Sequence, residues 1–230
     1  QHDYASIDLL GSTGKQLVAL RHSMSAPNDI FVVTPSKKEK ASTQTQISFE
    51  NKQIFDQLAL ANVTDRWVKT TDGKDMQVWI ITPPHFDPNK KYPTLLYCEG
   101  GPQSPVSQFW SFRWNFQMMA ANGYVIVAPN RRGLPGYGSQ WNEQISSDWT
   151  GQCMNDYLSA IDDAVANLPY VDKDRIGVHG WSFGGFMTIS LMTNYPETFK
   201  VGVAGGPVID WKWYEAMYGE RYMDTPQTNP

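Results

Sequence analysis

The fold is decided by the stretch Arg175-Ile176-Gly177-Val178-His179-Gly180-Trp181-Ser182-Phe183-Gly184-Gly185. It starts with a short apolar run that is typical of a buried strand, and it leads into an apolar run to Thr193 that is typical of a helix. Between them lies the pattern Gly-x-Ser-x-Gly, whose glycines permit a sharp turn from strand to helix. A serine on such a turn is exposed and can act as a nucleophile. Ser182 is therefore a candidate nucleophile.

A serine nucleophile needs a base, and the sequence supplies none after it. All four histidines precede this serine, namely His2, His22, His85 and His179. In α/β-hydrolases the order along the chain is serine, acid and then histidine. We expect the acid and the histidine to lie beyond Pro230, and residues 1–230 alone to be inactive. For His179, at the end of the strand, we expect a structural hydrogen bond and not the role of the base.

Strands and helices alternate from residue 64 onward. The pattern predicts a hairpin over 66–70 and 76–82, strands over 94–98, 124–128 and 201–204, and helices over 114–122, 152–168 and 183–193. We expect the strand 201–204 to be buried. In the helix 152–168, apolar residues recur at three- and four-residue spacing and form a stripe along one face: Met154, Leu158, Ile161, Val165 and Leu168. Its acids are expected to face solvent or cap the helix: Asp156, Asp162 and Asp163.

This alternation predicts an α/β fold with a mainly parallel sheet and helices on both faces. Residues 1–63 differ, because they contain only short β segments, at 15–21, 29–34, 45–49 and 56–61. That length equals about one and a half blades of a β-propeller. We therefore expect 1–63 to be the carboxy-terminal remnant of an all-β propeller and 64–230 to be the amino-terminal part of an α/β-hydrolase domain.

Composition excludes several classes of function. The net charge is −4 and no long basic run occurs, so we expect no nucleic-acid partner. No apolar stretch reaches the roughly 18 residues of a membrane span. The histidines are dispersed and neither Cys98 nor Cys153 has a Cys-x-x-Cys partner, so we expect no metal. No phosphate-binding glycine loop occurs, and we expect no cofactor.

Four motifs in order resemble the prolyl oligopeptidase family of serine peptidases, which join a β-propeller to an α/β-hydrolase domain. They are Glu99-Gly100-Gly101-Pro102, Arg131-Arg132-Gly133 with Gly136-Tyr137-Gly138, residues 171–177, and residues 180–185. The closing stretch, residues 205–222, looks like the dipeptidyl peptidase IV branch, and most of all like bacterial prolyl tripeptidyl aminopeptidase. Residues 99–110 look more like the dipeptidyl peptidase 5 branch.

The resemblance implies a serine exopeptidase that releases di- or tripeptides from the amino termini of peptides. It implies a preference for proline or a small apolar residue before the cut, and an acyl-enzyme on Ser182. The partners it implies are a peptide with a free amino terminus, the remainder of the same polypeptide, and a second copy in a homodimer. It also suggests a secreted or periplasmic protein.

A stripe of aromatic residues in the closing stretch suits a proline ring. On a helix, five residues fall within about 100° of one face: Trp211, Tyr214, Glu215, Tyr218 and Tyr222. By resemblance, the pocket for the residue before the scissile bond is lined by Val208, Trp211, Tyr214 and Tyr218, with Phe183 contributing. By the same resemblance Glu215 holds the free α-amino group of the substrate. The alternatives are an aromatic stripe that packs in the core and an exposed helix glutamate.

The oxyanion position departs from the pattern. The resemblance makes the backbone N–H of Phe183 one donor, and the dipeptidyl peptidase IV branch has a tyrosine where this chain has Glu99. An ionised carboxylate only accepts hydrogen bonds and would repel the developing negative charge. Glu99 is therefore protonated, or it points away, or another group supplies the second donor.

Two other functions are consistent with the sequence. A Gly-x-Ser-x-Gly motif does not distinguish a peptidase from an esterase, so ester hydrolysis is one alternative. The other is a propeller-hydrolase scaffold that binds without catalysis, which Glu99 and the absent base would suit. Two tests discriminate among these three functions: the effect of Glu215 on peptide cleavage, and the covalent labelling of Ser182.

Overall fold

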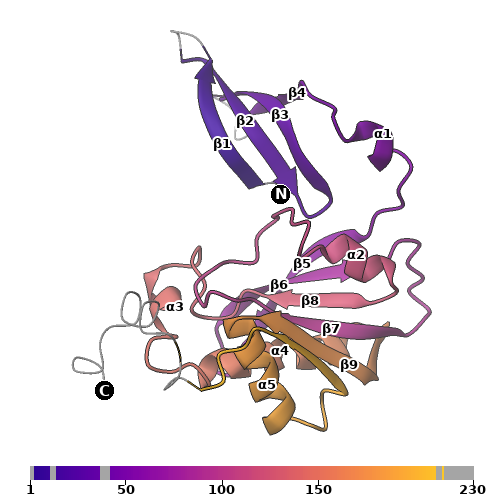
Figure 1. Cartoon of the computed structure of the whole chain (residues 1–230), viewed down its shortest axis with the longest axis vertical. Coiled ribbons are helices and arrows are strands. Elements are labelled where there is room, and N and C mark those ends of the chain that lie inside the picture. The colour runs from indigo at the N-terminus through magenta and orange to yellow at the C-terminus, as the bar shows by residue number, and fades with distance from the viewer. Residues whose placement is uncertain (1–2, 11–13, 37–41, 211–213, 215–230) are drawn as a thin grey trace.

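The computed structural model describes residues 3–10, 14–36, 42–210 and 214, and these form two β-sheets (Figure 1). The first sheet is antiparallel, with the order β1-β2-β3-β4. Its strands are β1 (Asp3–Leu10), β2 (Gln16–Ser23), β3 (Ala26–Thr34) and β4 (Thr43–Gln46). The second sheet has six strands, in the order β10-β9-β7-β8-β6-β5.

The amino-terminal sheet differs from the prediction at both of its ends. The prediction missed β1, in which polar and apolar residues alternate only weakly. The strand predicted over 56–61 is wrong, because a helical turn, α1 (Lys52–Phe55), comes first and an irregular segment follows it. Leu58 and Leu60 in that segment are exposed, so no apolar face drives a strand to pair there.

The six-stranded sheet is mixed. Its strands are β5 (Asn62–Lys69), β6 (Asp75–Thr82), β7 (Tyr92–Cys98), β8 (Val125–Pro129), β9 (Val171–Trp181) and β10 (Val201–Gly205). Four of them, β8, β7, β9 and β10, are parallel to one another. The hairpin β5-β6 adds the antiparallel edge. The carboxyl ends of the four parallel strands therefore meet at one edge of the sheet.

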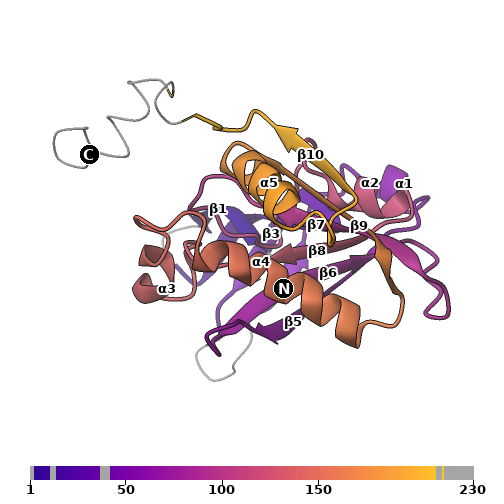
Figure 2. The same cartoon turned by 90° about the horizontal axis from the view of Figure 1, so that it is seen from below.

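Helices cover both faces of this sheet (Figure 2). The longer ones, α4 (Gln152–Asn167) and α5 (Phe183–Asn194), share one apolar core with alternate strand residues such as Val78 and Ile80. The intervening residues Trp79 and Ile81 face the other core, which α2 (Phe116–Ala121) covers. A short helix, α3 (Ser139–Glu143), lies in the loop after β8. Period-two alternation along the strands thus supplies both cores.

The burial of α4 and of the strand at 201–204 differs from the burial predicted from the sequence. On α4 the fully buried face is centred on Tyr157, Ala160, Ile161 and Ala164, and the predicted stripe residue Leu158 lies at its border. The strand predicted over 201–204 is β10, but it is not buried. Val203 is 65% exposed, because within the described residues β10 pairs only with β9, and it is the neighbouring Gly202 that faces α5.

A turn of the four-stranded sheet docks on the α2 face of the six-stranded sheet. The backbone N–H of Met24 donates to Oε1 of Gln108 at 3.0 Å, and the Met24 side chain is buried among Trp79 and Phe116. Gln117 of α2 also donates to the hydroxyl of Ser25. Because Gln108 lies in the loop that follows β7, the first sheet helps to fix a loop that leads to the candidate site.

Candidate nucleophile site

Ser182 lies on a sharp turn between β9 and α5. Its backbone has φ 58° and ψ −122°, a left-handed conformation that is unfavourable for serine. Two hydrogen bonds hold it there: the Ser182 N–H donates to the carbonyl oxygen of Gly205 at 2.9 Å, and the Phe186 N–H donates to the Ser182 carbonyl oxygen at 3.0 Å. The surrounding fold therefore enforces the strained turn that exposes a serine hydroxyl at the end of a strand.

The motif glycines are required by close packing against β7. A Cβ atom on Gly184 would lie 2.1 Å from the carbonyl oxygen of Cys98, and one on Gly180 would lie 2.6 Å from the same atom. No side chain fits at such distances. The motif therefore lets α5 start directly against the end of β7 and places Ser182 beside the loop that follows β7.

Three segments with polar side chains lie at the carboxyl edge of the parallel strands. Glu99 follows β7, Arg131 follows β8, and Ser182 follows β9. The loop after β7 packs beside the serine, since a Cβ on Gly100 would lie 3.8 Å from the Ser182 Cβ. Ligands of open sheets with parallel strands bind at this edge.

The backbone N–H and the ring of Phe183 lie in different surroundings. It is the first residue of α5, so its N–H is one of those at the helix amino terminus without an intrahelical acceptor. Its ring is only 3% exposed and packs near the rings of Phe186 and Trp149. The predicted oxyanion donor is thus placed next to Ser182, whereas the ring that was expected to contribute to the substrate pocket lies in the core.

The Glu99 carboxylate is held by two donors within its own segment. The hydroxyl of Tyr97 donates to Oε2 and the N–H of Gly100 donates to Oε1, both at 3.0 Å. Burial raises the pKa of Glu99 above its ordinary value, against the opposing effect of the Tyr97 hydrogen bond. Of the alternatives open for Glu99, these contacts favour a carboxyl group turned toward Tyr97.

His179 is buried on the α2 face, where its ring lies 5.3 Å from that of Tyr97. Its Nε2 has no hydrogen-bond partner among the described residues, so the predicted structural hydrogen bond is absent at this nitrogen. Burial lowers the pKa of His179 to about 4 from the ordinary 6.5. The imidazole is therefore neutral at neutral pH.

This pKa predicts a loss of stability in mild acid. Between pH 6.5 and about 4 the unfolded chain binds the His179 proton and the folded chain does not, so stability falls as the pH falls. The full effect is about 3 kcal/mol. Urea unfolding at pH 7.5 and at pH 4.5 measures it, with His179→Phe as the comparison. The variant should lose less stability on acidification than the wild type, and an equal loss would refute the assignment.

The predicted substrate pocket is only partly within the described residues. Val208 and Tyr214 are half-buried. Three further predicted residues lie outside the described part of the chain: Trp211, Glu215 and Tyr218. Their roles stay predictions.

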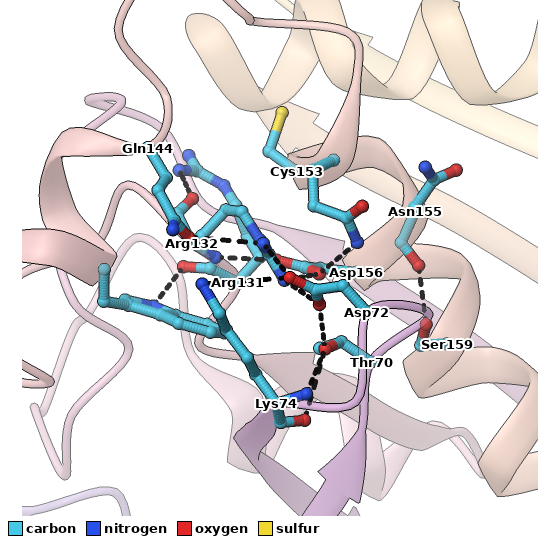
Figure 3. A network of polar contacts seen from close by, with 12 residues as sticks. Thr70, Asp72, Lys74, Arg131, Arg132, Gln144, Cys153, Asn155, Asp156 and Ser159 are labelled. Atoms are coloured by element: carbon cyan, nitrogen blue, oxygen red, sulfur yellow. Dashed lines mark hydrogen bonds and ion pairs between the residues drawn. The ribbon is translucent and has the colours of Figure 1, made fainter.

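A buried ion-pair network that was not predicted from the sequence lies in the loop after β8 (Figure 3). Arg132, three residues after the end of β8, pairs with Asp156 of α4 and with Asp72 of the β5-β6 turn, each at 2.8 Å. Asp156 was expected to face solvent or cap the helix, yet its exposed fraction is 0%. The Arg132 hydrogen bond lowers the pKa of Asp72 well below its usual range. The Arg131-Arg132-Gly133 motif could have pointed to this network, but the acidic partners of Arg132 are distant in sequence.

The described residues form neither a metal site nor a membrane-spanning helix. Across the described ranges, no group of three or more His, Cys, Asp and Glu side chains is arranged to hold a metal ion. None of the helices seen in the described part of the chain has the length and apolar character that crossing a membrane requires.

A strained serine between a parallel strand and a helix, beside an unpaired helix N–H, is the geometry with which serine hydrolases present their nucleophile. The sequence model of the prolyl oligopeptidase family matches residues 110–230, which is more than half of the chain. The chain therefore belongs to the prolyl oligopeptidase family, and its mixed sheet is part of that family's fold.

Relatives in this family are dipeptidyl peptidases. The chain is 48% identical over 223 residues to dipeptidyl-peptidase 5 of Porphyromonas gingivalis, covering 97% of this chain and 31% of that protein. It is 44% identical over 220 residues to dipeptidyl-peptidase 5 of Porphyromonas endodontalis, covering 96% and 30%. The crystal structure of Porphyromonas gingivalis dipeptidyl peptidase 4 superposes with a TM-score of 0.75 at 28% identity, covering 99% and 32%. The chain thus spans about a third of the length of these relatives.

Proposed function

We propose that the protein containing this chain is a serine exopeptidase that releases dipeptides from the amino termini of peptides. The observation that carries the proposal is the strained backbone of Ser182 on its strand-to-helix turn, beside the N–H of Phe183. The relatives named dipeptidyl-peptidase 5 support the same reaction. They favour a dipeptide over a tripeptide as the product.

The reaction would proceed through an acyl-enzyme on Ser182. The Ser182 Oγ bonds to the carbonyl carbon of the scissile amide, its proton passes to a histidine, and the carbonyl oxygen becomes negatively charged. The Phe183 N–H donates to that oxygen. The C–N bond then breaks, the leaving amine takes the proton, and water later releases the dipeptide. The histidine and its acid would come from polypeptide beyond residue 230, so residues 1–230 alone would be inactive.

The architecture proposed with this reaction has two parts. Residues 64–230 would form the first part of an α/β-hydrolase domain, and residues 1–63 would be the last part of a β-propeller. The docking of Met24 against Gln108 supports an amino-terminal part that contacts the loop leading to the site. A secreted or periplasmic homodimer would be in keeping with the family.

Specificity would come from the residues around and beyond Val208. Val208, Trp211, Tyr214 and Tyr218 would line the pocket for proline or another small apolar residue before the cut. Flat aromatic side chains suit the apolar faces of a proline ring. The carboxylate of Glu215 would bind the free amino group of the substrate as a charge-assisted pair.

A comparison of free and blocked amino termini tests the proposal. We expect the complete protein to cleave glycyl-prolyl-p-nitroanilide, and to cleave the N-acetylated form at least about 10-fold more slowly, because the charge-assisted contact with Glu215, worth about 1.5–3 kcal/mol, is lost. Glycine p-nitroanilide serves as the control for a simple aminopeptidase. Equal rates on the free and acetylated dipeptide anilides would contradict the exopeptidase.

A further inference from the structure

Arg131 is a fully buried cation that forms no direct ion pair with a carboxylate among the described residues, although its charge acts on that of Glu99. Its exposed fraction is 0%, and its three hydrogen bonds all go to neutral acceptors. Nε donates to the Tyr157 hydroxyl at 3.3 Å, Nη1 to the carbonyl oxygen of Arg132 at 2.9 Å, and Nη2 to that of Pro102 at 2.9 Å. The neighbouring Arg132 pairs with two carboxylates instead (Figure 3). Burying a charge without an ionic partner is costly, so stability alone does not account for Arg131.

Arg131 contacts the aromatic ring of Phe183. The guanidinium carbon lies over the Phe183 ring, 5.0 Å from its centroid, which is within the range of a cation–π interaction. The backbone N–H of the same residue is the proposed oxyanion donor. Arg131 therefore anchors the side chain of the residue whose main chain must be aimed at the substrate.

The second contact is with the loop on the other side of the serine. Pro102, whose carbonyl oxygen accepts from Nη2, ends the Glu99–Pro102 loop that packs beside Ser182 through Gly100. The guanidinium is fully buried and held by three hydrogen bonds, and Gly133 leaves the space for it, because a Cβ there would lie 2.7 Å from Nη1. One rigid cation thus ties together the two segments that border the serine.

We propose that Arg131 is a positioning residue of the oxyanion site. It fixes Phe183 and the Glu99–Pro102 loop relative to each other, and it places a permanent positive charge behind the point where the substrate carbonyl oxygen becomes negative. A preorganised charge in a water-poor interior stabilises such an oxygen far more than it would in bulk water. The same charge offsets the Glu99 carboxylate, which stands where the related branch has a neutral hydroxyl. The inference rests on the proposed serine peptidase function.

The test compares Arg131→Met, Arg131→Lys and Tyr157→Phe in the complete protein, with the concentration of competent enzyme set by fluorophosphonate titration. We expect Arg131→Met to lower kcat by about 10- to 100-fold, less than the loss of a direct oxyanion donor, with KM within threefold. Affinity for a prolyl boronic acid dipeptide, whose adduct carries the negative charge, should fall by a similar factor. Affinity for the product dipeptide, which forms no oxyanion, should stay unchanged.

The other variants separate charge from packing. Arg131→Lys keeps the charge and should turn over at least threefold faster than Arg131→Met, and Tyr157→Phe should stay within threefold of wild type. A wild-type kcat in Arg131→Met, equal losses of boronate and product affinity, or no advantage of lysine over methionine would each overturn the inference. If Arg131→Met does not fold, Arg131→Lys provides the test. Its affinity for the boronate, divided by its affinity for the product dipeptide, should be lower than the same ratio in the wild type. An unchanged ratio would refute the inference. If the wild type neither cleaves peptides nor reacts with the titrant, the proposed function itself fails.

Discussion

Ser182→Ala is expected to lower kcat for glycyl-prolyl-p-nitroanilide by about a million-fold, the loss seen when a serine peptidase is deprived of its nucleophile. The hydroxyl makes no capping hydrogen bond to α5, so its removal should leave the fold in place. The alanine must adopt the same φ of 58°, which is unfavourable for alanine as it is for serine. The loss should therefore appear in kcat and not in the melting temperature, and steady-state kinetics with a thermal melt on the same sample measures both.

The control for this substitution is a more deeply buried serine away from the site. Ser159 of α4 donates to the carbonyl oxygen of Asn155, and it lies on the side of the core formed by α4. Ser159→Ala should keep kcat within about twofold, because no group at the carboxyl edge of the sheet changes. Retention of more than a hundredth of wild-type activity by Ser182→Ala would show that another residue is the nucleophile.

Asp156→Ala is expected to reduce the free energy of unfolding by about 3–5 kcal/mol, the range for breaking a buried ion pair from one side. Asp156 accepts from the Arg132 backbone N–H and from two guanidinium nitrogens. Its removal leaves a cation that is 3% exposed with one half-exposed partner, Asp72. Urea unfolding followed by tryptophan fluorescence at pH 7.5 measures the change.

Asp163→Ala is the matched control on the same helix. Asp163 pairs with Arg66 at 2.8 Å, but both side chains are partly exposed, so an Arg66 left without its partner can still reach water. We expect a loss of about 1 kcal/mol or less. Equal losses for the two aspartates would show that the Arg132 network is no more important to the fold than a surface pair.

The parts of the fold that the sequence predicted are those with a strong local pattern. The apolar run before Ser182 and the stripe on α4 predicted β9 and α4 to within a few residues, because burial of a periodic face dominates local structure. The glycines of the Gly-x-Ser-x-Gly motif predicted the turn at Ser182. The structure explains why they are needed, because only glycine fits against the end of β7. Residues 56–61 were predicted wrongly, because a short run without periodicity does not distinguish a strand from an irregular segment.

The parts that the sequence could not predict depend on contacts between distant segments. Asp156 was expected to face solvent or cap the helix, yet it pairs with Arg132, which is 24 residues away, and the second partner of Arg132, Asp72, is another 60 residues away. The same holds for Arg131, whose contacts with Phe183 and Pro102 arise only after the loops of three strands meet. The exposure of Val203 follows from the position of β10 at the edge of the sheet that the described residues form, which a local pattern does not encode.

Covalent labelling of the complete protein identifies its nucleophile. The protein is treated with a fluorophosphonate at pH 7.5, digested, and analysed by mass spectrometry to locate the adduct. We expect a single modification, on Ser182, that is absent from Ser182→Ala and forms more slowly in the presence of glycyl-prolyl-p-nitroanilide. An unmodified Ser182, with the adduct on another serine or with no adduct at all, would contradict the assignment of Ser182 as the nucleophile.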